Sequence, residues 1–125
     1  MSVNSREKGK VGERELAGFL RELGVADARR GVQYQGGTES PDVCAETGLP
    51  GVHIECKRVE RLDPWQAIKQ ATDDAGPGKI PAVFWRRNRR DWLVVLRAEN
   101  FVRLIQDGKE KTPPGSPGGA LDILS

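Results

Sequence analysis

The chain has 125 residues, of which 37% are hydrophobic and 30% charged, a composition that suits one soluble domain with a modest core. No apolar run reaches the length of a membrane span, and residues 1–6 lack the apolar segment of a signal peptide, so we expect a cytoplasmic protein. The net charge of +2 is too small to indicate nucleic-acid binding by itself. The two cysteines, Cys44 and Cys56, are expected to be buried thiols, because two cysteines alone do not make a zinc site.

The first element is predicted to be an amphipathic helix. Residues 1–8 are polar and expected to be frayed, whereas residues 9–23 have helical periodicity and end before Gly24. Glu13 falls on the apolar face of this helix, where an acidic side chain is unusual and requires an explanation. It either serves a function there or sits in the first turn, where its carboxylate favours the helix dipole and reaches solvent. The apolar face consists of Leu16, Phe19, Leu20 and Leu23.

Three short strands are predicted next. Residues 32–34 are a short strand, and residues 35–40 are a polar loop that leads to Pro41. The segments 42–45 and 52–57 are two further strands. Glycines and proline in the connection between them are typical of a hairpin.

The segment 52–57 alternates apolar and polar side chains, so Glu55 and Lys57 point to the same face of the strand, together with His53. If the two strands pair as a hairpin, Asp42 and Glu55 converge. Two carboxylates beside a lysine form a site for a hard cation next to a group that orients water. This arrangement suits metal-assisted hydrolysis of a phosphodiester.

A plainer interpretation of the same residues stays open. Aspartate after proline is common in turns, and Glu-x-Lys on an exposed strand is usually a solvated pair, so the pattern could be accidental. His53 is expected to be a structural or DNA-contacting residue rather than a ligand, because the other donors are oxygens.

A second helix is predicted to begin at Asp63, with Asp as the N-cap and Pro64 at the first helical position, and to end near Gly76. Gln66 and Gln70 lie one turn apart on a face next to the apolar one. That apolar face is expected to consist of Trp65, Ile68, Ala71 and Thr72.

The remaining elements are two strands and a helix. Residues 80–85 are a nearly continuous apolar strand, as expected for one that is covered on both faces. Residues 86–90, four arginines around one asparagine, form a turn to a strand at 92–96, and residues 99–105 form a short last helix. A run of charged residues such as this one is usually a solvated turn. Guanidinium groups that lie close together can also bind phosphates.

The predicted order is helix, short strand, strand, strand, helix, strand, strand, helix. It gives a mixed sheet flanked by helices, in the α/β or α+β class, with the middle helix as a crossover between parallel strands. We expect one domain over residues 1–106. Residues 107–125 are a Gly/Pro-rich tail, which the apolar residues 121–124 could anchor.

Three segments resemble the PD-(D/E)xK nuclease superfamily. They are Pro41-Asp42, Glu55-Cys56-Lys57 and the opening Lys8-Gly9-Lys10-Val11-Gly12-Glu13-Arg14-Glu15-Leu16, which is similar to that of archaeal-type Holliday junction resolvases and related small phage endonucleases. The basic hairpin from Trp85 to Trp92 is also similar. The resemblance implies a restriction-endonuclease-like fold, an α/β architecture with an αβββαβ core plus a further strand and a short helix.

The resemblance also implies roles for individual residues. Asp42, Glu55 and the main-chain carbonyl of Cys56 would bind Mg²⁺, for which Mn²⁺ would substitute. Lys57 would orient the attacking water, and Glu13 would complete the acid cluster through water or a second metal. A glutamine on the following helix, Gln70 or else Gln66, would assist them.

The leading hypothesis is therefore a Mg²⁺-dependent Holliday junction resolvase that leaves 5′-phosphates and acts in the host cell if it is phage-encoded. Its two-fold substrate implies a homodimer, with Trp65, Phe84, Trp85 and Trp92 as candidate interface residues. The alternatives are a nuclease on the same core that cuts flap, nicked or duplex DNA, and a DNA-binding module with an inactive nuclease fold. The candidate phosphate contacts are Arg29, Arg30, Arg58, Arg61, Arg86, Arg87, Arg89 and Arg90.

Overall fold

A computed structural model describes residues 5–31 and 41–110 of the chain. The elements are α1 (Ser5–Glu22), β1 (Arg29–Arg30), β2 (Val43–Cys44), β3 (Val52–Arg58), α2 (Pro64–Asp74), β4 (Ile80–Arg86), β5 (Leu93–Val95) and α3 (Ala98–Glu110). Their order is the predicted one.

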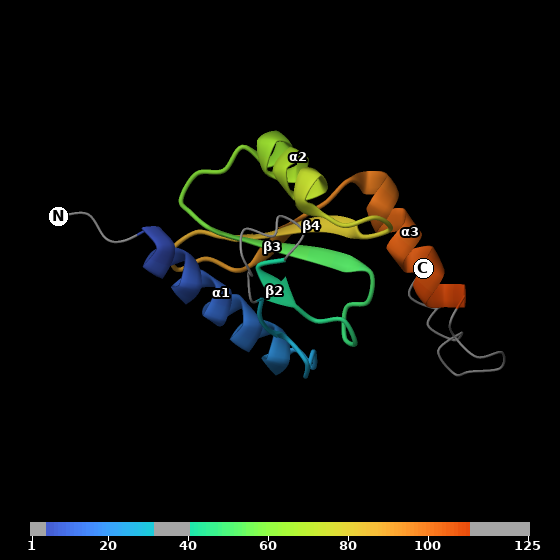
Figure 1. Ribbon diagram of the computed structural model, residues 1–125, viewed down its shortest axis with the longest axis horizontal. Helices are drawn as coiled ribbons and strands as arrows, with labels where there is room; N and C mark the ends of the chain where they lie inside the picture. The colour runs from blue at the N-terminus through green and yellow to red at the C-terminus, as the bar shows by residue number, and fades with distance from the viewer. Residues whose placement is uncertain (1–4, 32–40, 111–125) are drawn as a thin grey trace.

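The five strands form one mixed sheet in the order β1-β2-β3-β4-β5. β3 and β4 are parallel, with α2 as the connection between them, and the other neighbouring pairs are antiparallel. Helices α1 and α2 cover opposite faces of this sheet, as Figure 1 shows. The predicted α/β class, a restriction-endonuclease-like mixed sheet flanked by helices, is therefore confirmed.

The larger part of the core lies between α1 and the sheet. Leu16 and Leu20 of α1 pack with Val43, Ile54 and Phe84 from three adjacent strands. The α2 face of the sheet has a smaller core, in which Val83 is packed against the helix residues Ala67, Ile68 and Ala71.

The first helix differs from its prediction at both ends. It begins at Ser5 rather than Gly9, so residues 5–8 are helical. It ends at Glu22, and Leu23, predicted on the buried face, is 66% exposed. The reason is that the chain turns at Gly24, whose φ of +102° directs the backbone away from the helix axis. The first short strand is Arg29–Arg30, while the predicted strand 32–34 lies outside the described residues.

The second helix begins as predicted, since the Asp63 carboxylate accepts main-chain N–H groups from Trp65 and Gln66. Its buried face is different, because Ala67 is buried whereas Trp65 is 85% exposed and Thr72 is also exposed. Trp65 lies in the first turn of the helix, directly after Pro64.

The last helix is longer than predicted and reaches Glu110 instead of ending at Ile105. The added residues 106–110 include no large apolar side chain, so they show none of the apolar periodicity on which the prediction relied. The division into a domain and a tail at residue 107 stays a prediction. Within the described ranges, none of the three helices has the length and apolar character needed to cross a membrane.

Candidate active site

The β2–β3 hairpin brings Asp42 and Glu55 together. Val43 pairs with Ile54, and the main-chain N–H of Asp42 donates to the carbonyl of Ile54 at 2.9 Å. The Asp42 Oδ2 atom accepts a hydrogen bond of 2.8 Å from the main-chain N–H of Cys56, which fixes the carboxylate over β3. The two acids that sequence spacing predicted to converge are therefore neighbours on the sheet.

Negative charge is concentrated around Asp42. The pKa of its carboxyl is raised to about 7, first by burial and then by the nearby charges of Glu55 and Glu13, against the lowering effect of the hydrogen bond from the Cys56 N–H. Burial, with Asp42 and Glu13 close by, also raises the pKa of the Cys56 thiol to about 12. This thiol therefore stays protonated and is not a nucleophile.

His53 is a site residue whose role the sequence did not establish. Its Nε2 atom lies 2.6 Å from Glu55 Oε2, within hydrogen-bonding distance, and both side chains are buried. A ring that is only 2% exposed does not reach DNA, so of the two predicted roles the structural one holds. The sequence signal for this contact was the i, i+2 spacing of His53 and Glu55, which places both side chains on one face of β3.

Glu13 comes to the site from the other side of the sheet, on α1. Its carboxylate accepts a hydrogen bond of 3.0 Å from Arg30 Nε, and its side chain is 19% exposed. It is close enough to Asp42 to raise the pKa of that residue. Of the two interpretations offered for Glu13, the structure favours the one in which it belongs to the acid cluster. Arg30, predicted to contact phosphate, is bound to Glu13.

Lys57 is held by the helix that follows its strand. Lys57 Nζ donates a hydrogen bond of 3.2 Å to Gln70 Oε1, so α2 places Gln70 beside the lysine. Gln66, the alternative, is exposed one turn earlier, and its main-chain N–H belongs to the Asp63 cap. The geometry thus favours Gln70.

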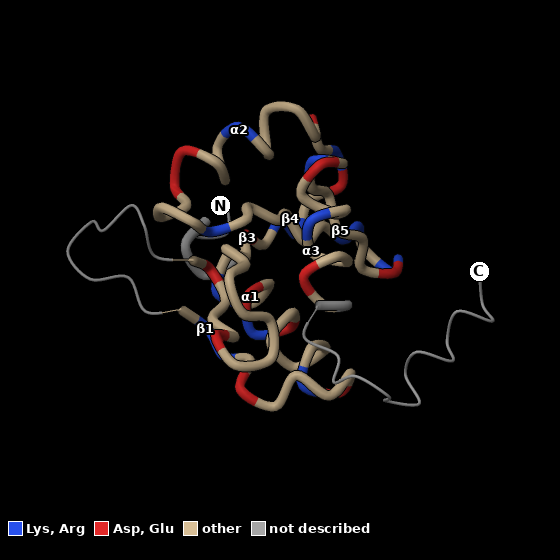
Figure 2. The backbone as a smooth tube through the Cα atoms, turned by 90° about the vertical axis from the view of Figure 1, so that its right-hand side faces the viewer, with Lys and Arg blue, Asp and Glu red and all other residues tan. Residues whose placement is uncertain are grey.

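The other predicted arginines divide into two groups. Arg58 and Arg86 both bind Glu15 of α1, with N–O distances of 2.8 and 3.2 Å, and Arg29 binds Glu46 on the surface. The second group is exposed and lies in or near the β4–β5 turn and the segment after β3: Arg61, Arg87, Arg89 and Arg90. Figure 2 shows acidic and basic positions interspersed over the described chain rather than separated onto two halves.

Gly31 directly follows β1 and lies against the Pro41–Asp42 peptide that carries the first acid of the site. Its N–H donates to the carbonyl of Asp42 at 2.8 Å, and a methyl group at this position would collide with the Pro41 carbonyl oxygen. The absence of a side chain at Gly31 therefore lets β1 lie directly against the Pro41–Asp42 peptide.

The donor set suits magnesium. Over residues 5–31 and 41–110, no group of three or more His, Cys, Asp or Glu side chains is arranged to hold a metal ion. Magnesium in proteins, however, is usually bound by one or two carboxylates and keeps waters and substrate phosphate oxygens as its other ligands. Asp42, Glu55 and the Cys56 carbonyl fit that requirement, and a cation would offset the burial and the neighbouring negative charge that together raise the pKa of Asp42.

Comparison with known proteins identifies a family that this chain matches. The family model described as "Phage putative PDDEXK endonuclease" matches residues 4–114, which include the acids, the Glu-x-Lys segment and the basic hairpin. Neither the curated proteins nor the solved structures gave a significant match.

Proposed function

Because this chain belongs to the family of phage PDDEXK endonucleases, we propose that it is a Mg²⁺-dependent, structure-selective DNA endonuclease and that its substrate is the four-way (Holliday) junction. The observation that carries this proposal is that Asp42 lies against β3 beside Glu55, while Lys57, bound to Gln70, follows two residues later on the same face of the strand. Membership of the family implies DNA as the substrate class. The choice of junction over other DNA rests on the resemblance of residues 8–16 to resolvases.

Each residue of the site has a chemical role in this proposal. Asp42, Glu55 and the main-chain carbonyl of Cys56 hold Mg²⁺, and Glu13 contributes through water. When bound, the metal supplies Lewis-acid polarisation of the scissile phosphate. His53 and the Cys56 N–H hold the two carboxylates in position, because each lies within hydrogen-bonding distance of one of them.

Lys57 acts on the water and the phosphate. Its ammonium group, held by Gln70, orients the attacking water and stabilises the negative charge that develops on the phosphate oxygens. Cleavage of the bond between phosphorus and the 3′-oxygen leaves a 5′-phosphate. Mn²⁺ substitutes for Mg²⁺, since both accept oxygen ligands.

DNA binding is assigned to the exposed arginines. Arg87, Arg89 and Arg90 extend from the β4–β5 turn, and Arg61 lies near the end of β3. Each phosphate contact releases a counterion, so removal of one such arginine should reduce the slope of log affinity against log salt by about 1. A phage nuclease of this kind acts on DNA in the cytoplasm of the host cell.

A homodimer matches the two-fold symmetry of a junction. Of the predicted interface residues, Phe84 is in the core, Trp85 and Trp92 are half-buried and Trp65 is exposed. The exposed apolar residues of the edge strand β5 and of α3 are better candidates for the contact with a second copy: Val94, Phe101, Val102 and Ile105, each about half exposed.

Two other functions are compatible with the family. A nuclease on the same core could cut flap, nicked or duplex DNA. A DNA-binding module with an inactive nuclease fold is disfavoured, because it would have no physical reason to keep Glu13, Asp42, Glu55 and Lys57 in one cluster.

The test is cleavage of a labelled four-way junction, a flap and a linear duplex at equal concentration, with Mg²⁺, with EDTA and with the Asp42→Asn variant. We expect paired symmetric nicks near the branch with Mg²⁺ only, and a loss of activity in both controls. Equal cutting of all three substrates would contradict junction selectivity but keep the metal-dependent nuclease. Absence of cutting together with absence of Mg²⁺ binding would refute the catalytic assignment itself.

A further inference from the structure

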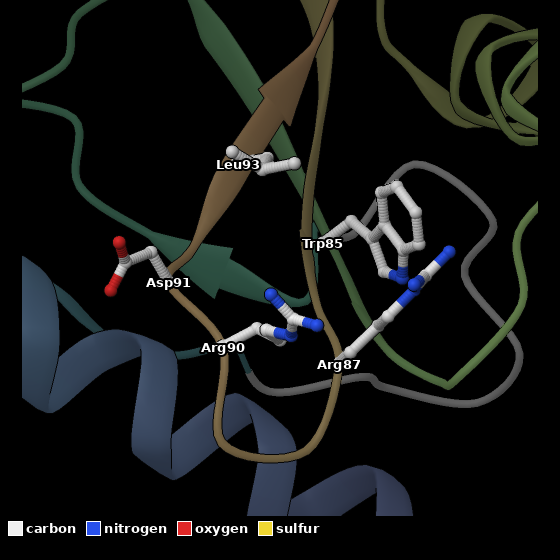
Figure 3. A pocket seen from close by; sticks show the side chains of 5 residues that line it. All are labelled: Trp85, Arg87, Arg90, Asp91 and Leu93. Carbon is white, nitrogen blue, oxygen red and sulfur yellow. The ribbon is translucent and has the colours of Figure 1, made fainter.

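A pocket lies beside the proposed catalytic residues, at the turn between β4 and β5. It has a volume of about 370 Å³, within the range of about 300–1,000 Å³ that is typical of ligand sites. Its lining comes from both strands and the turn: Trp85, Arg87, Arg90, Asp91 and Leu93. Figure 3 shows these side chains from close by. None of them belongs to the acid cluster.

The sheet register places this pocket next to Lys57. Lys57 of β3 pairs with Trp85 of β4, and Trp85 pairs with Leu93 of β5, so all three side chains point to the same face of the sheet. Neighbouring strands are about 5 Å apart, which puts Trp85 within the span of one nucleotide from a phosphate held at Lys57.

The pocket combines a flat aromatic surface with positive charge. The Arg87 guanidinium lies over the Trp85 indole, 5.4 Å from the ring centroid, and in Figure 3 the two side chains lie side by side. The Trp85 Nε1–H donates to the Val59 carbonyl at 2.8 Å, which fixes the ring plane. Leu93, 55% exposed, adds an apolar wall, and the Asp91 carboxylate points away from the indole.

We infer that this pocket binds an unpaired nucleotide next to the cut phosphate, with its base stacked on Trp85 and its phosphate bound by Arg87 and Arg90. A base inside a duplex is paired and stacked on both sides, and offering its face to an indole costs the energy of unpairing and unstacking it. A base at the branch of a four-way junction is paired but has lost a stacking neighbour, so it unpairs at lower cost, and a base in a flap or an open end is already unpaired. The inference rests on the proposed function and deepens it, since the pocket selects DNA in which the base beside the scissile bond is unpaired or is readily unpaired at a branch.

The test measures binding without cleavage, by fluorescence anisotropy of labelled DNA in EDTA, in the Asp42→Asn background. One DNA has an unpaired nucleotide at a branch and the other is a blunt duplex of the same length. Trp85→Ala should weaken binding of the branched DNA by about 5- to 100-fold and leave the duplex affinity nearly unchanged, while Trp85→Phe keeps most of the affinity. Trp65→Ala, which removes an exposed tryptophan outside the pocket, should change neither.

A second pair of variants keeps the test valid if Trp85→Ala does not fold. Arg87→Ala and Arg89→Ala each remove one exposed arginine from the same turn, but only Arg87 lines the pocket. Arg87→Ala should reduce affinity for the branched DNA several-fold more than Arg89→Ala does. On the blunt duplex, the two variants should lose the same amount of affinity. If Trp85→Ala or Arg87→Ala weakened the binding of the branched DNA and of the duplex equally, the inference would be overturned. The proposed nuclease function would then still stand. Failure of the Asp42→Asn protein to bind either DNA would overturn both.

Discussion

Three of the proposed catalytic side chains are each held by a polar neighbour. His53 lies against Glu55, the Cys56 N–H donates to Asp42, and Gln70 accepts from Lys57. Groups that orient a ligand in this way typically affect metal affinity or activity by about 10- to 100-fold. At the scale of single residues, the proposed function therefore depends on more positions than the Pro-Asp and Glu-x-Lys pattern contains.

His53→Ala should reduce cleavage by about 10- to 100-fold, because the Glu55 carboxylate loses the group that positions it. His53→Gln, which can still donate to that carboxylate, should recover most of the loss. Mg²⁺ affinity measured by calorimetry should follow the same order as cleavage. Equal loss in both variants, with Mg²⁺ binding unchanged, would show that His53 only fills space.

Gln70→Ala should lower the rate of the chemical step by roughly tenfold, because Lys57 is no longer held beside the site. Gln66→Ala is the matched control, since Gln66 is an exposed glutamine on the same helix and its main-chain N–H alone contributes to the cap. Single-turnover cleavage at saturating DNA measures this step. A larger effect of Gln66→Ala would reverse the choice between the two glutamines.

At the scale of elements, the connection between β2 and β3 is fixed by a residue from before β1. The Asp27 carboxylate accepts main-chain N–H groups from Thr47 at 2.7 Å and Gly48 at 2.9 Å. A side chain at Gly48 would collide with Val25 and approach Asp27, so the connection lies directly on this segment. Asp27 thereby helps to set where the hairpin that carries Asp42 and Glu55 begins and ends.

The hydrogen bond from Thr47, the strongest influence, lowers the pKa of Asp27 below its ordinary value of 3.8. Because the folded pKa lies below the unfolded one, the stabilisation is present above the unfolded pKa and is lost as pH falls through the folded pKa. Asp27→Ala should lower the urea midpoint of unfolding near neutral pH, and the difference from the wild type should shrink below about pH 4. Urea titrations at several pH values measure it. A difference that is constant down to about pH 3 would contradict this assignment.

The sequence predicted the elements better than their buried faces. Alternation in 52–57 and the Asp63-Pro64 start predicted β3 and the beginning of α2, because both are local properties of the chain. Trp65 and Leu23 were wrongly assigned to buried faces, since their exposure depends on where a neighbouring element ends.

In the candidate site, the spacing along the sequence predicted that Asp42 and Glu55 meet. The pairing of Arg30 with Glu13 and of Arg58 with Glu15 depends on how α1 lies on the sheet, which spacing does not give.

At the scale of the whole molecule, the described part of the sheet ends in short strands. β1 has two residues and β5 has three, so the edges offer few main-chain groups for pairing with another chain. α3 adds an apolar face next to β5, with Phe101 and Ile105 each about half exposed. A second copy would therefore pack through side chains rather than extend the sheet.

Phe101→Glu should shift the protein from dimer to monomer and raise the dimer dissociation constant at least about tenfold, because a carboxylate would be buried in an apolar contact. Leu23→Glu is the control, since it places the same charge at an exposed leucine after α1. Sedimentation equilibrium over a range of concentrations measures both. A monomeric wild-type protein, or a dimer that Phe101→Glu leaves intact, would contradict the proposed interface.

The close approach of Gly31 to the Pro41–Asp42 peptide limits which sequences can keep this activity. Any side chain at position 31 must displace the Pro41–Asp42 peptide, and with it the Asp42 carboxylate. In a random library sorted for variants that fold but no longer cut DNA, position 31 should therefore recur beside the acids, although glycine has no reactive atom. Among natural relatives, it should vary as little as the residues that perform the chemistry.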